Sequence, residues 1–531
     1  MIYEIRGIQL NLDDHEDMLR QLAAKKAKVP VERVEKLWIR RRSIDARKGK
    51  VAFVHTLGVE ISGKAPKGEV YPLKAEEAWS GPFGREALMG PIVVVGAGPC
   101  GLMAAYTLVS HGYPVVLLER GGRMAERDAA TDAFHHGGEL NEDNNLLFGE
   151  GGAGAYSDGK LTARNKDASA RRVLELLIKH GADGSIGYDA KPHIGTDVLK
   201  KVVSGVTDSI MAMGGKVLFH AKLTGLCERD GVITELRFCY NGTEQCIQPG
   251  AVVLAIGHSA RDTYRMLHDL GTPMEQKPFA VGARIEHHQS MIDATQYGSF
   301  AGHPKLGAAE YALTARAGDR GVYTFCMCPG GYVVPSVNIP HRLCVNGMSY
   351  HKRDGVNANS ALVVQVGPKD FYEGPLGGME FQERLERAAF DYTGSYAAPM
   401  QRVEDLLKGR KTTALGDVKP TYPMGSALCH LNRVLPDFIV SAMAEAIPQM
   451  ARRLKGFDAP DAVLTGVEGR TSAPVRIVRN ESGISPFADN LYPAGEGSGY
   501  AGGIVSAGAD GIRTAQSIME RFSCEYHGFT L

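Results

Sequence analysis

A short apolar strand that leads directly into a glycine-rich turn is the feature that most constrains the fold. Residues 92–101 are Ile-Val-Val-Val-Gly-Ala-Gly-Pro-Cys-Gly, a β-branched run followed by G-x-G-x-x-G. In this motif the first glycine permits a tight turn, the second lets the backbone approach a pyrophosphate, and the third lets the helix pack on the strand. These positions are Gly96, Gly98 and Gly101. The motif predicts a dinucleotide-binding unit with the phosphate charge at the helix N-terminus.

A second strand supports this prediction. Residues 114–118 are Pro-Val-Val-Leu-Leu, and Glu119 follows them. A carboxylate at this distance, about 23 residues beyond Gly96, can accept hydrogen bonds from ribose hydroxyls. Arg120 follows directly, and we include it among the candidate cofactor contacts. Apolar runs at 92–95, 115–119 and 251–256 alternate with helical patterns, which predicts an α/β fold with a parallel sheet.

Another glycine-rich turn lies near the end of the chain. Residues 491–504 are Leu-Tyr-Pro-Ala-Gly-Glu-Gly-Ser-Gly-Tyr-Ala-Gly-Gly-Ile, a strand, an acidic residue and a turn that opens a helix. Gly495 lies in the turn and Glu496 can accept a bond from a ribityl hydroxyl, while the amides around Gly503 and Ile504 can face the pyrimidine end of a flavin. FAD extends across the sheet and needs both turns, whereas NAD needs only the first. The two motifs together predict non-covalent FAD.

At this point the sequence resembles the glutathione-reductase-type FAD proteins with two dinucleotide-binding folds. Further motifs that begin at Phe148, Lys191, Leu254 and Lys277 are similar to those of a large group of bacterial FAD-dependent dehydrogenases, mostly without an assigned substrate. The resemblance covers almost the whole chain. It implies that a loop at 149–159 wraps the flavin phosphates and ribityl chain, and that a turn at 255–257 ends the strand beneath it. The cofactor contacts implied in this way are Gly151, Gly152, Gly154 and Gly257.

The chain is long enough for several domains. We expect a small N-terminal α/β domain at 1–82, compatible with a ferredoxin-like fold, and a Rossmann-like FAD-binding domain at 90–278. A mixed α+β substrate domain is inserted at 279–480, and residues 481–531 complete the FAD-binding domain. Between Lys25 and Lys50 there are eleven basic and three acidic residues. A solvated sheet edge explains this charge best, and a docking surface for a protein or anionic partner is the alternative.

Candidate catalytic residues are less well defined, because the flavin itself performs hydride or electron transfer and the protein supplies orientation and proton transfer. His193, His258 and His288 can act as acids near neutral pH, although structural roles are favoured for each. Lys160 and Arg284 can place positive charge near the flavin N1 or a substrate carboxylate. The resemblance also suggests that Thr471, Ser472 and Arg476 line the flavin cavity.

Two cysteines of the insert, Cys326 and Cys328, are further candidates. At i and i+2 on a regular strand their side chains would share one face, and a disulfide between them would be strained. Packing is therefore favoured, and lining of the flavin pocket is the alternative. No spacing typical of a metal site is present, so no metal is expected.

Composition excludes several classes of protein. Lysine plus arginine and aspartate plus glutamate both number 60, so no overall charge favours nucleic acid. Nine scattered cysteines without a C-x-x-C pair indicate reduced thiols and a cytoplasmic location. No signal peptide or membrane span is expected. We expect an FAD-dependent oxidoreductase that acts on a small organic substrate, with NAD(P)H as a transient donor; a tRNA-modifying flavoenzyme and a non-enzymatic electron-transfer or scaffold protein are the alternatives.

Overall fold

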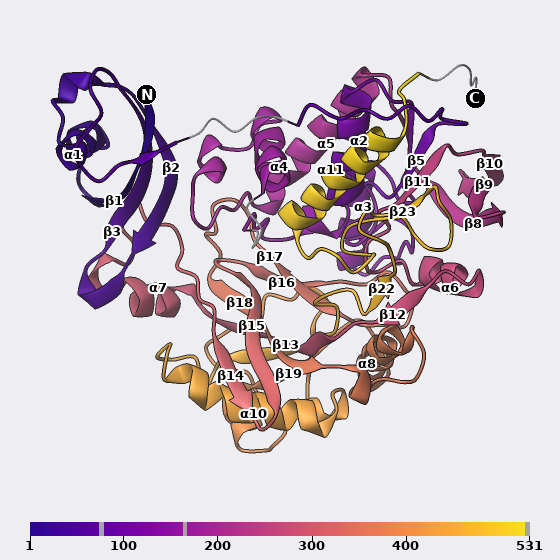
Figure 1. The fold of residues 1–531 in the computed structure, drawn as a ribbon. Coiled ribbons are helices and arrows are strands. Elements are labelled where there is room, and N and C mark those ends of the chain that lie inside the picture. Colours follow the sequence, from indigo (N-terminus) through magenta and orange to yellow (C-terminus); the bar gives the residue numbers. More distant parts are fainter. Residues whose placement is uncertain (74–78, 163–166, 526–531) are drawn as a thin grey trace.

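The structure is a computed structural model that describes residues 1–73, 79–162 and 167–525. Its centre is a five-stranded parallel sheet in the order β23-β11-β5-β6-β7 (Figure 1). The first four of these strands are buried along their length, which explains their continuous apolar sequences. The predicted α/β class with a parallel sheet is confirmed. The strands are β5 (Ile92–Val95), β6 (Val115–Leu118), β7 (Lys216–Leu218), β11 (Ala251–Leu254) and β23 (Leu491–Pro493).

Helices cover one face of this sheet, and a small antiparallel sheet covers the other. The helical core joins residues of α2, α4, α5 and α11 to one face of β5 and β6, and α11 lies beside α2 although almost four hundred residues separate them (Figure 1). The opposite core joins the sheet to β8, β9 and β10. The elements are α2 (Pro99–Ser110), α3 (Met124–His135), α4 (Ala168–Lys179), α5 (Thr196–Ala212), α6 (Arg261–Asp269), α11 (Ile504–Arg521), β8 (Ala221–Arg229), β9 (Val232–Tyr240) and β10 (Thr243–Ile247).

The segment between these two parts of the FAD-binding fold forms a seven-stranded sheet in the order β14-β15-β18-β13-β21-β19-β20. Helices α8 and α10 pack on it around a second core (Figure 1). A hairpin, β16–β17, contacts both this sheet and the FAD-binding part. The elements are β13 (Phe279–His288), α7 (Gln289–Tyr297), β14 (Thr314–Ala317), β15 (Arg320–Cys328), β16 (Tyr332–Pro335), β17 (Val345–Met348), β18 (Asn357–Val366), α8 (Gly377–Thr393), β19 (Ala398–Arg402), α9 (Val403–Leu407), β20 (Ser426–Leu428), α10 (Asp437–Ala451) and β21 (Val463–Glu468).

A two-stranded ribbon joins the two parts. Strand β12 (Met274–Gln276) leads into the insert, β22 (Val475–Ile477) leads out of it, and the two pair antiparallel. The insert therefore leaves and rejoins the FAD-binding part at one place.

The N-terminal unit lies at one end of the molecule (Figure 1). Its sheet has the order β2-β3-β1-β4, with α1 between β1 and β2, as in the split βαβ half of a ferredoxin-like fold. The second helix of that fold is missing from the described residues 62–70, whereas all four strands of the ferredoxin-like sheet are present. The basic strand β2 is an edge strand, as its charge predicts. The elements are β1 (Ile2–Asn11), α1 (Met18–Ala27), β2 (Val34–Asp45), β3 (Ala52–Ile61) and β4 (Tyr71–Pro72).

Specific contacts attach this unit to the rest of the chain. Arg42 of β2 donates two hydrogen bonds, of 2.8 and 3.1 Å, to the Asp189 carboxylate. A small apolar cluster joins Leu12 and Val51 to Leu306 of the insert. Among the described residues, no helix is long and apolar enough to cross a membrane.

Candidate flavin site

The turn after β5 has the geometry that the glycine motif predicts. Gly96 has φ +102°, in the region that favours glycine. A Cβ on Gly101 would lie 1.8 Å from the Gly96 carbonyl oxygen, so only glycine lets α2 approach β5 this closely. A Cβ on Gly98 would instead meet only the Gly152 Cα, at 4.0 Å. Space therefore remains in front of Gly98, at the N-terminus of α2.

Glu119 ties the first turn to the glycine-rich loop that follows. Its Oε2 accepts a 2.8 Å bond from the Ala97 amide, and its Oε1 accepts 2.9 Å bonds from the amides of Gly121 and Gly149. The sequence predicts a ribose contact for this carboxylate, and the structure adds a second role. Glu119 organises the backbone of both loops around the predicted nucleotide position.

The glycine-rich loop lies directly over the turn. The Gly151 amide donates a 2.8 Å bond to the Ala97 carbonyl. Gly151 and Gly152 have φ values of +84° and +60°. A Cβ on Gly154 would lie 3.2 Å from Cγ1 of Ile504, at the start of α11. The loop thus connects the two glycine turns that the sequence separates.

The closing turn is anchored from behind by a buried ion pair. The Gly495 amide donates a 2.8 Å bond to Asp510 of α11, and Arg479 binds both oxygens of the same carboxylate at 2.9 and 2.8 Å. The turn ends at Gly503, which has φ +90° and precedes the first residue of α11. The first amides of a helix have no partner within it, so those at Ile504 point out of the helix end.

These turns fit a flavin dinucleotide in shape and in chemistry. A Cβ at Gly257, Gly469, Gly502 or Gly503 would meet no atom within 4 Å. Two helix N-termini, those of α2 and α11, supply amides for a pyrophosphate and for the pyrimidine carbonyls. Gly96, Gly98, Gly151, Gly152, Gly257, Glu496 and Gly503 are the residues that would hold FAD here.

Two predicted cofactor contacts have other partners. Arg120 donates bonds of 3.0 Å to Asp143 and 3.1 Å to Asp262, and its guanidinium lies 4.3 Å from the Phe148 ring centroid. Lys160 donates to the Asp158 carboxylate and to the Met327 carbonyl. Each is engaged by protein groups, so contact with the cofactor stays a prediction for both.

Several polar side chains lie near Glu496. His258 Nδ1 lies 3.8 Å from the Glu496 carboxylate, and burial lowers the pKa of His258. Burial also lowers the pKa of Lys277. Arg476, on β22, is 43% exposed and lies 5.5 Å from the Tyr500 ring centroid. Thr471 exchanges hydrogen bonds with the Ala280 backbone, which fixes the start of β13.

A second cluster, buried and charged, forms where the glycine-rich loop meets the insert. Asp158 accepts bonds from Lys160, from Ser349 and from both sides of the Arg353 guanidinium. Its cationic neighbours hold the pKa of Asp158 well below its usual range, against the opposing effect of burial. His193 lies beside this cluster. Its Nε2 is 3.1 Å from the His351 carbonyl oxygen, and burial lowers its pKa.

Arg284 extends this cluster into the insert. Fully buried on β13, it donates to Glu468 at 3.2 and 3.3 Å and to Asn359 at 3.0 Å. Burial raises the pKa of Glu468 to about 7, although Arg284 opposes the shift. Glu468 precedes Gly469, whose Cα faces open space. A carboxyl group with this pKa can exchange a proton near neutral pH.

The cysteine pair departs from the regular strand that the sequence predicts. The pairing of β15 with β18 shifts between Phe325 and Cys328, and Cys326 has φ +43°. The expectation of two residues at i and i+2 on an ideal strand is therefore wrong, because a bulge changes the direction of the backbone. Arg284 Nη2 lies 2.6 Å from the Cys326 carbonyl oxygen and 3.4 Å from Cys328 Sγ.

The predicted catalytic residues thus fall into two groups. His193, Lys160, Arg284, Cys326 and Cys328 lie in or beside the buried charged cluster, whereas Arg476 lies by the connecting ribbon. His288 caps α7, away from both groups. The cluster contains three residues that the sequence analysis missed: Asp158, Arg353 and Glu468. Asp158 lies in the glycine-rich loop at 149–159 and Glu468 lies three residues before Thr471, so both could have been chosen, but nothing in the sequence connects Arg353 to them.

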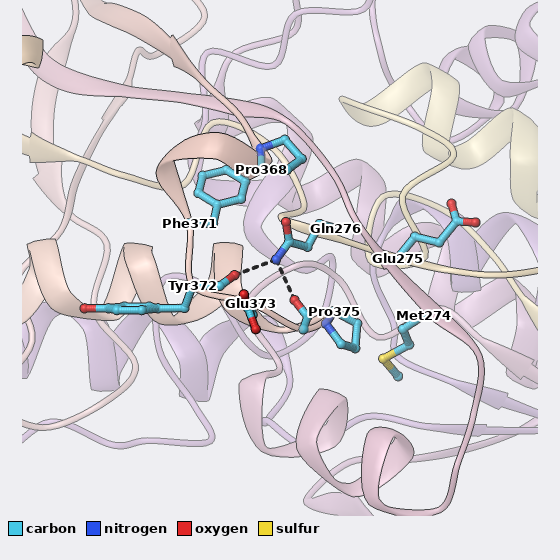
Figure 2. Close-up of a pocket in the computed structure, with 9 residues that line it drawn as sticks. Met274, Glu275, Gln276, Pro368, Phe371, Tyr372, Glu373 and Pro375 are labelled. Atoms are coloured by element: carbon cyan, nitrogen blue, oxygen red, sulfur yellow. Dashed lines mark hydrogen bonds between the residues drawn. The ribbon is translucent and has the colours of Figure 1, made fainter.

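A shallow hollow of about 480 Å³ lies outside this site. It is formed by β12 and the loop before α8, and Gln276 Nε2 donates bonds of 2.7 and 2.6 Å to the carbonyls of Tyr372 and Gly374 (Figure 2). None of the residues that line it is a predicted cofactor or catalytic residue.

Comparison with known proteins identifies FAD-dependent and Rossmann-like regions in this chain. Residues 278–471 match the family described as "FAD-dependent protein, C-terminal domain-like", and residues 94–141 match an NAD(P)-binding Rossmann-like domain. Residues 1–60 match a domain of unknown function, DUF8436. An uncharacterised protein of Clostridium beijerinckii is 45% identical over 98% of this chain and 99% of its own length.

Solved structures matched by this chain include a flavin-dependent brominase, Bmp2, with a TM-score of 0.37 and 12% identity over 81% of this chain and 80% of that one. A glycerol-3-phosphate dehydrogenase of Bacillus halodurans complexed with FAD has a TM-score of 0.36 and 13% identity over 81% and 64%.

The fold and the two glycine turns define an FAD-binding flavoprotein of the Rossmann type. The chain belongs to the FAD-dependent oxidoreductase family, together with its relative from Clostridium beijerinckii.

Proposed function

We propose that this protein transfers a hydride or electrons between FAD and a small organic substrate, at a C=C, C=O or C–N bond. The observation that supports the proposal is the buried Glu468–Arg284 pair on the insert. It combines a carboxyl group that titrates near neutral pH with a fixed cation. Such a pair beside a redox cofactor is suited to proton transfer.

The chain's own residues have separate tasks in this proposal. FAD, when bound, supplies the hydride or electron chemistry. Arg284 fixes the orientation of Glu468, and Glu468 Oε holds or donates the proton that accompanies reduction of the substrate. The insert covers the site and excludes water, which strengthens both interactions. His193 and Arg353 are positioned to attract a polar group of the substrate.

The electron donor is part of the proposal. The described chain has one Rossmann-type turn at the start of the fold, so a pyridine nucleotide would bind transiently at the flavin face. NADH and NADPH are both candidates. A reduced, cytoplasmic setting is compatible with the nine unpaired cysteines.

Anaerobic rapid mixing tests the proposal. The FAD-loaded protein is mixed with NADH or NADPH and then with enoate, carbonyl or imine acceptors, while the visible absorbance of the flavin is followed. We expect reduction by one nucleotide and reoxidation by at least one acceptor class. Glu468→Gln should slow reoxidation by about 10²–10⁴-fold, whereas Glu380→Gln, at an exposed position on α8, should not. A flavin that no organic acceptor oxidises faster than free reduced FAD would contradict the proposal.

A further inference from the structure

Cationic side chains surround the backbone at Cys326, whose side chain is partly buried. Arg284 contacts its carbonyl oxygen at 2.6 Å, and Lys160 donates to the carbonyl of the adjacent Met327. Arg353 is the third cation of this cluster, and its Nε donates a hydrogen bond to Asp158. The facing anions are Asp158, Glu468 and the partly exposed Glu310, which lies 3.4 Å from Arg353.

The charges in this cluster balance best with one more anion near Cys326. Burial raises the pKa of Glu468 to about 7. When Glu468 is protonated, three cations among the described residues, Lys160, Arg284 and Arg353, face two carboxylates, those of Asp158 and Glu310. The remaining titratable neighbour, Tyr311, is neutral, because burial raises its pKa. Unbalanced buried charge is costly, so a thiolate would stabilise the cluster.

The two cysteines also lie close together. Cys328 Sγ lies 3.3 Å from the Cys326 carbonyl oxygen and 3.4 Å from Arg284 Nη2. The interaction with Cys328, together with Arg284 and Lys160, lowers the pKa of Cys326 against the effect of burial. The same interaction and burial raise the pKa of Cys328. One sulfur is thus suited to be the thiolate and the other the proton donor.

The backbone at Cys326 has an unusual conformation, with a positive φ angle. A non-glycine residue at φ +43° costs free energy, and such residues concentrate at functional sites. The bulge brings Cys328 Sγ and the Cys326 carbonyl oxygen next to Arg284. The strain argument assumes regular strand geometry at both cysteines, which Cys326 does not have.

We propose that Cys326 and Cys328 form a redox-active dithiol that exchanges an electron pair with the flavin. In the oxidised form a bond joins the two sulfurs. Its reduction breaks that bond with two electrons from the reduced flavin and yields the Cys326 thiolate and the Cys328 thiol, with one proton taken up by Cys328. In the reverse direction the dithiol loses two electrons to the oxidised flavin. This inference rests on the proposed function for its electron source, but the thiol chemistry can be measured without it.

The first test measures thiol reactivity in protein with and without FAD. Alkylation by iodoacetamide is followed over pH, and each cysteine is identified by peptide mass. Cys326 should react at a lower pH than Cys246, which is exposed on β10 and serves as the internal reference. Oxidation by diamide should remove two hydrogen atoms from the peptide that contains both cysteines. Cys328→Ser should abolish that loss while Cys326 stays reactive. A Cys326 that reacts only at the pH of Cys246, or no internal disulfide, would overturn the proposal.

The second test counts electrons. Anaerobic titration of the diamide-treated, FAD-loaded protein with dithionite should require four electrons per FAD, because a dithiol couple takes up two in addition to the flavin. The Cys326→Ser/Cys328→Ser protein should require two, and the Cys246→Ser control should require four. Two electrons in every protein would overturn electron exchange. If the protein takes up four electrons per FAD but no organic acceptor reoxidises the flavin, the redox-active dithiol is supported and the proposed substrate reaction is contradicted.

Discussion

Gly98 is the residue at which FAD binding can be separated from folding. A Cβ there would make only an ordinary contact with Gly152 in the protein itself. The same methyl group would occupy space that the pyrophosphate needs. We therefore expect Gly98→Ala to lower FAD affinity by about tenfold or more, a cost of about 1.4 kcal/mol.

This prediction is checked by titrating apoprotein with FAD and by unfolding the apoprotein in urea. The free energy of unfolding should change by less than about 1 kcal/mol. Gly307→Ala is the control, because Gly307 also faces open space but lies on the insert, away from the turns. Unchanged affinity in Gly98→Ala would place the pyrophosphate elsewhere.

The raised pKa of Glu468 predicts that the stability of the folded protein depends on pH. Burial raises its pKa from 4.5 in the unfolded chain to about 7, so the folded protein binds the extra proton between these values. Stability from this group is present below pH 4.5 and is lost as pH rises through about 7, by at most about 3 kcal/mol.

Urea unfolding of the FAD-loaded protein at several pH values measures this effect. Glu468→Gln stays neutral throughout, so its stability relative to the wild type should increase across this pH interval. Parallel profiles for the two proteins would show that Glu468 is ionised in the folded state at all these pH values.

At the scale of elements, the Asp510–Arg479 pair connects α11 to the closing turn. Asp510 is 3% exposed and also accepts the Gly495 amide. Removal of one partner from a buried pair leaves the other charge unpaired. We expect Asp510→Asn to destabilise the apoprotein by about 3 kcal/mol and to weaken FAD binding, because the turn loses its anchor.

A second arginine beside Asp510 provides a matched control. Arg513 lies 3.4 Å from Asp510 and is 43% exposed, so Arg513→Gln should cost less than about 1 kcal/mol. Urea unfolding and FAD titration of both variants check this order. Equal effects would mean that the buried pair does not fix the turn.

The elements also show what could be predicted from sequence. Gly96, Gly98, Gly101 and Glu119 lie within one βαβ unit, where local spacing determines geometry, so the strand, turn and helix agree with expectation. The charged cluster could not be predicted in this way. Asp158 and Arg353 are 195 residues apart, and only the packing of the insert on the glycine-rich loop brings them together. The bulge at Cys326 depends on pairing with β18, which no local pattern specifies.

At the scale of the whole molecule, the N-terminal unit is separate from the flavin site. It attaches through Arg42 to Asp189 and through Leu12 to Leu306, and every residue assigned to FAD lies beyond residue 90. We predict that deletion of residues 1–82 leaves a yellow protein with unchanged FAD affinity. Spectral titration of the truncated protein measures this. Truncated protein that folds, as judged by circular dichroism, but does not bind FAD would show that the N-terminal unit supports the site. A role for its basic surface in binding a protein or anionic partner stays a prediction.

The cofactor itself is the central claim, and its release from the purified protein is the most direct test. Bound FAD should also stabilise the protein by about 3–4 kcal/mol when free FAD exceeds its Kd by about 100- to 1,000-fold. We predict that the protein is yellow and that acid precipitation releases FAD, identified by its mass, in a ratio near one per chain. Release of FMN, or a colourless protein that added FAD does not convert, would contradict the account.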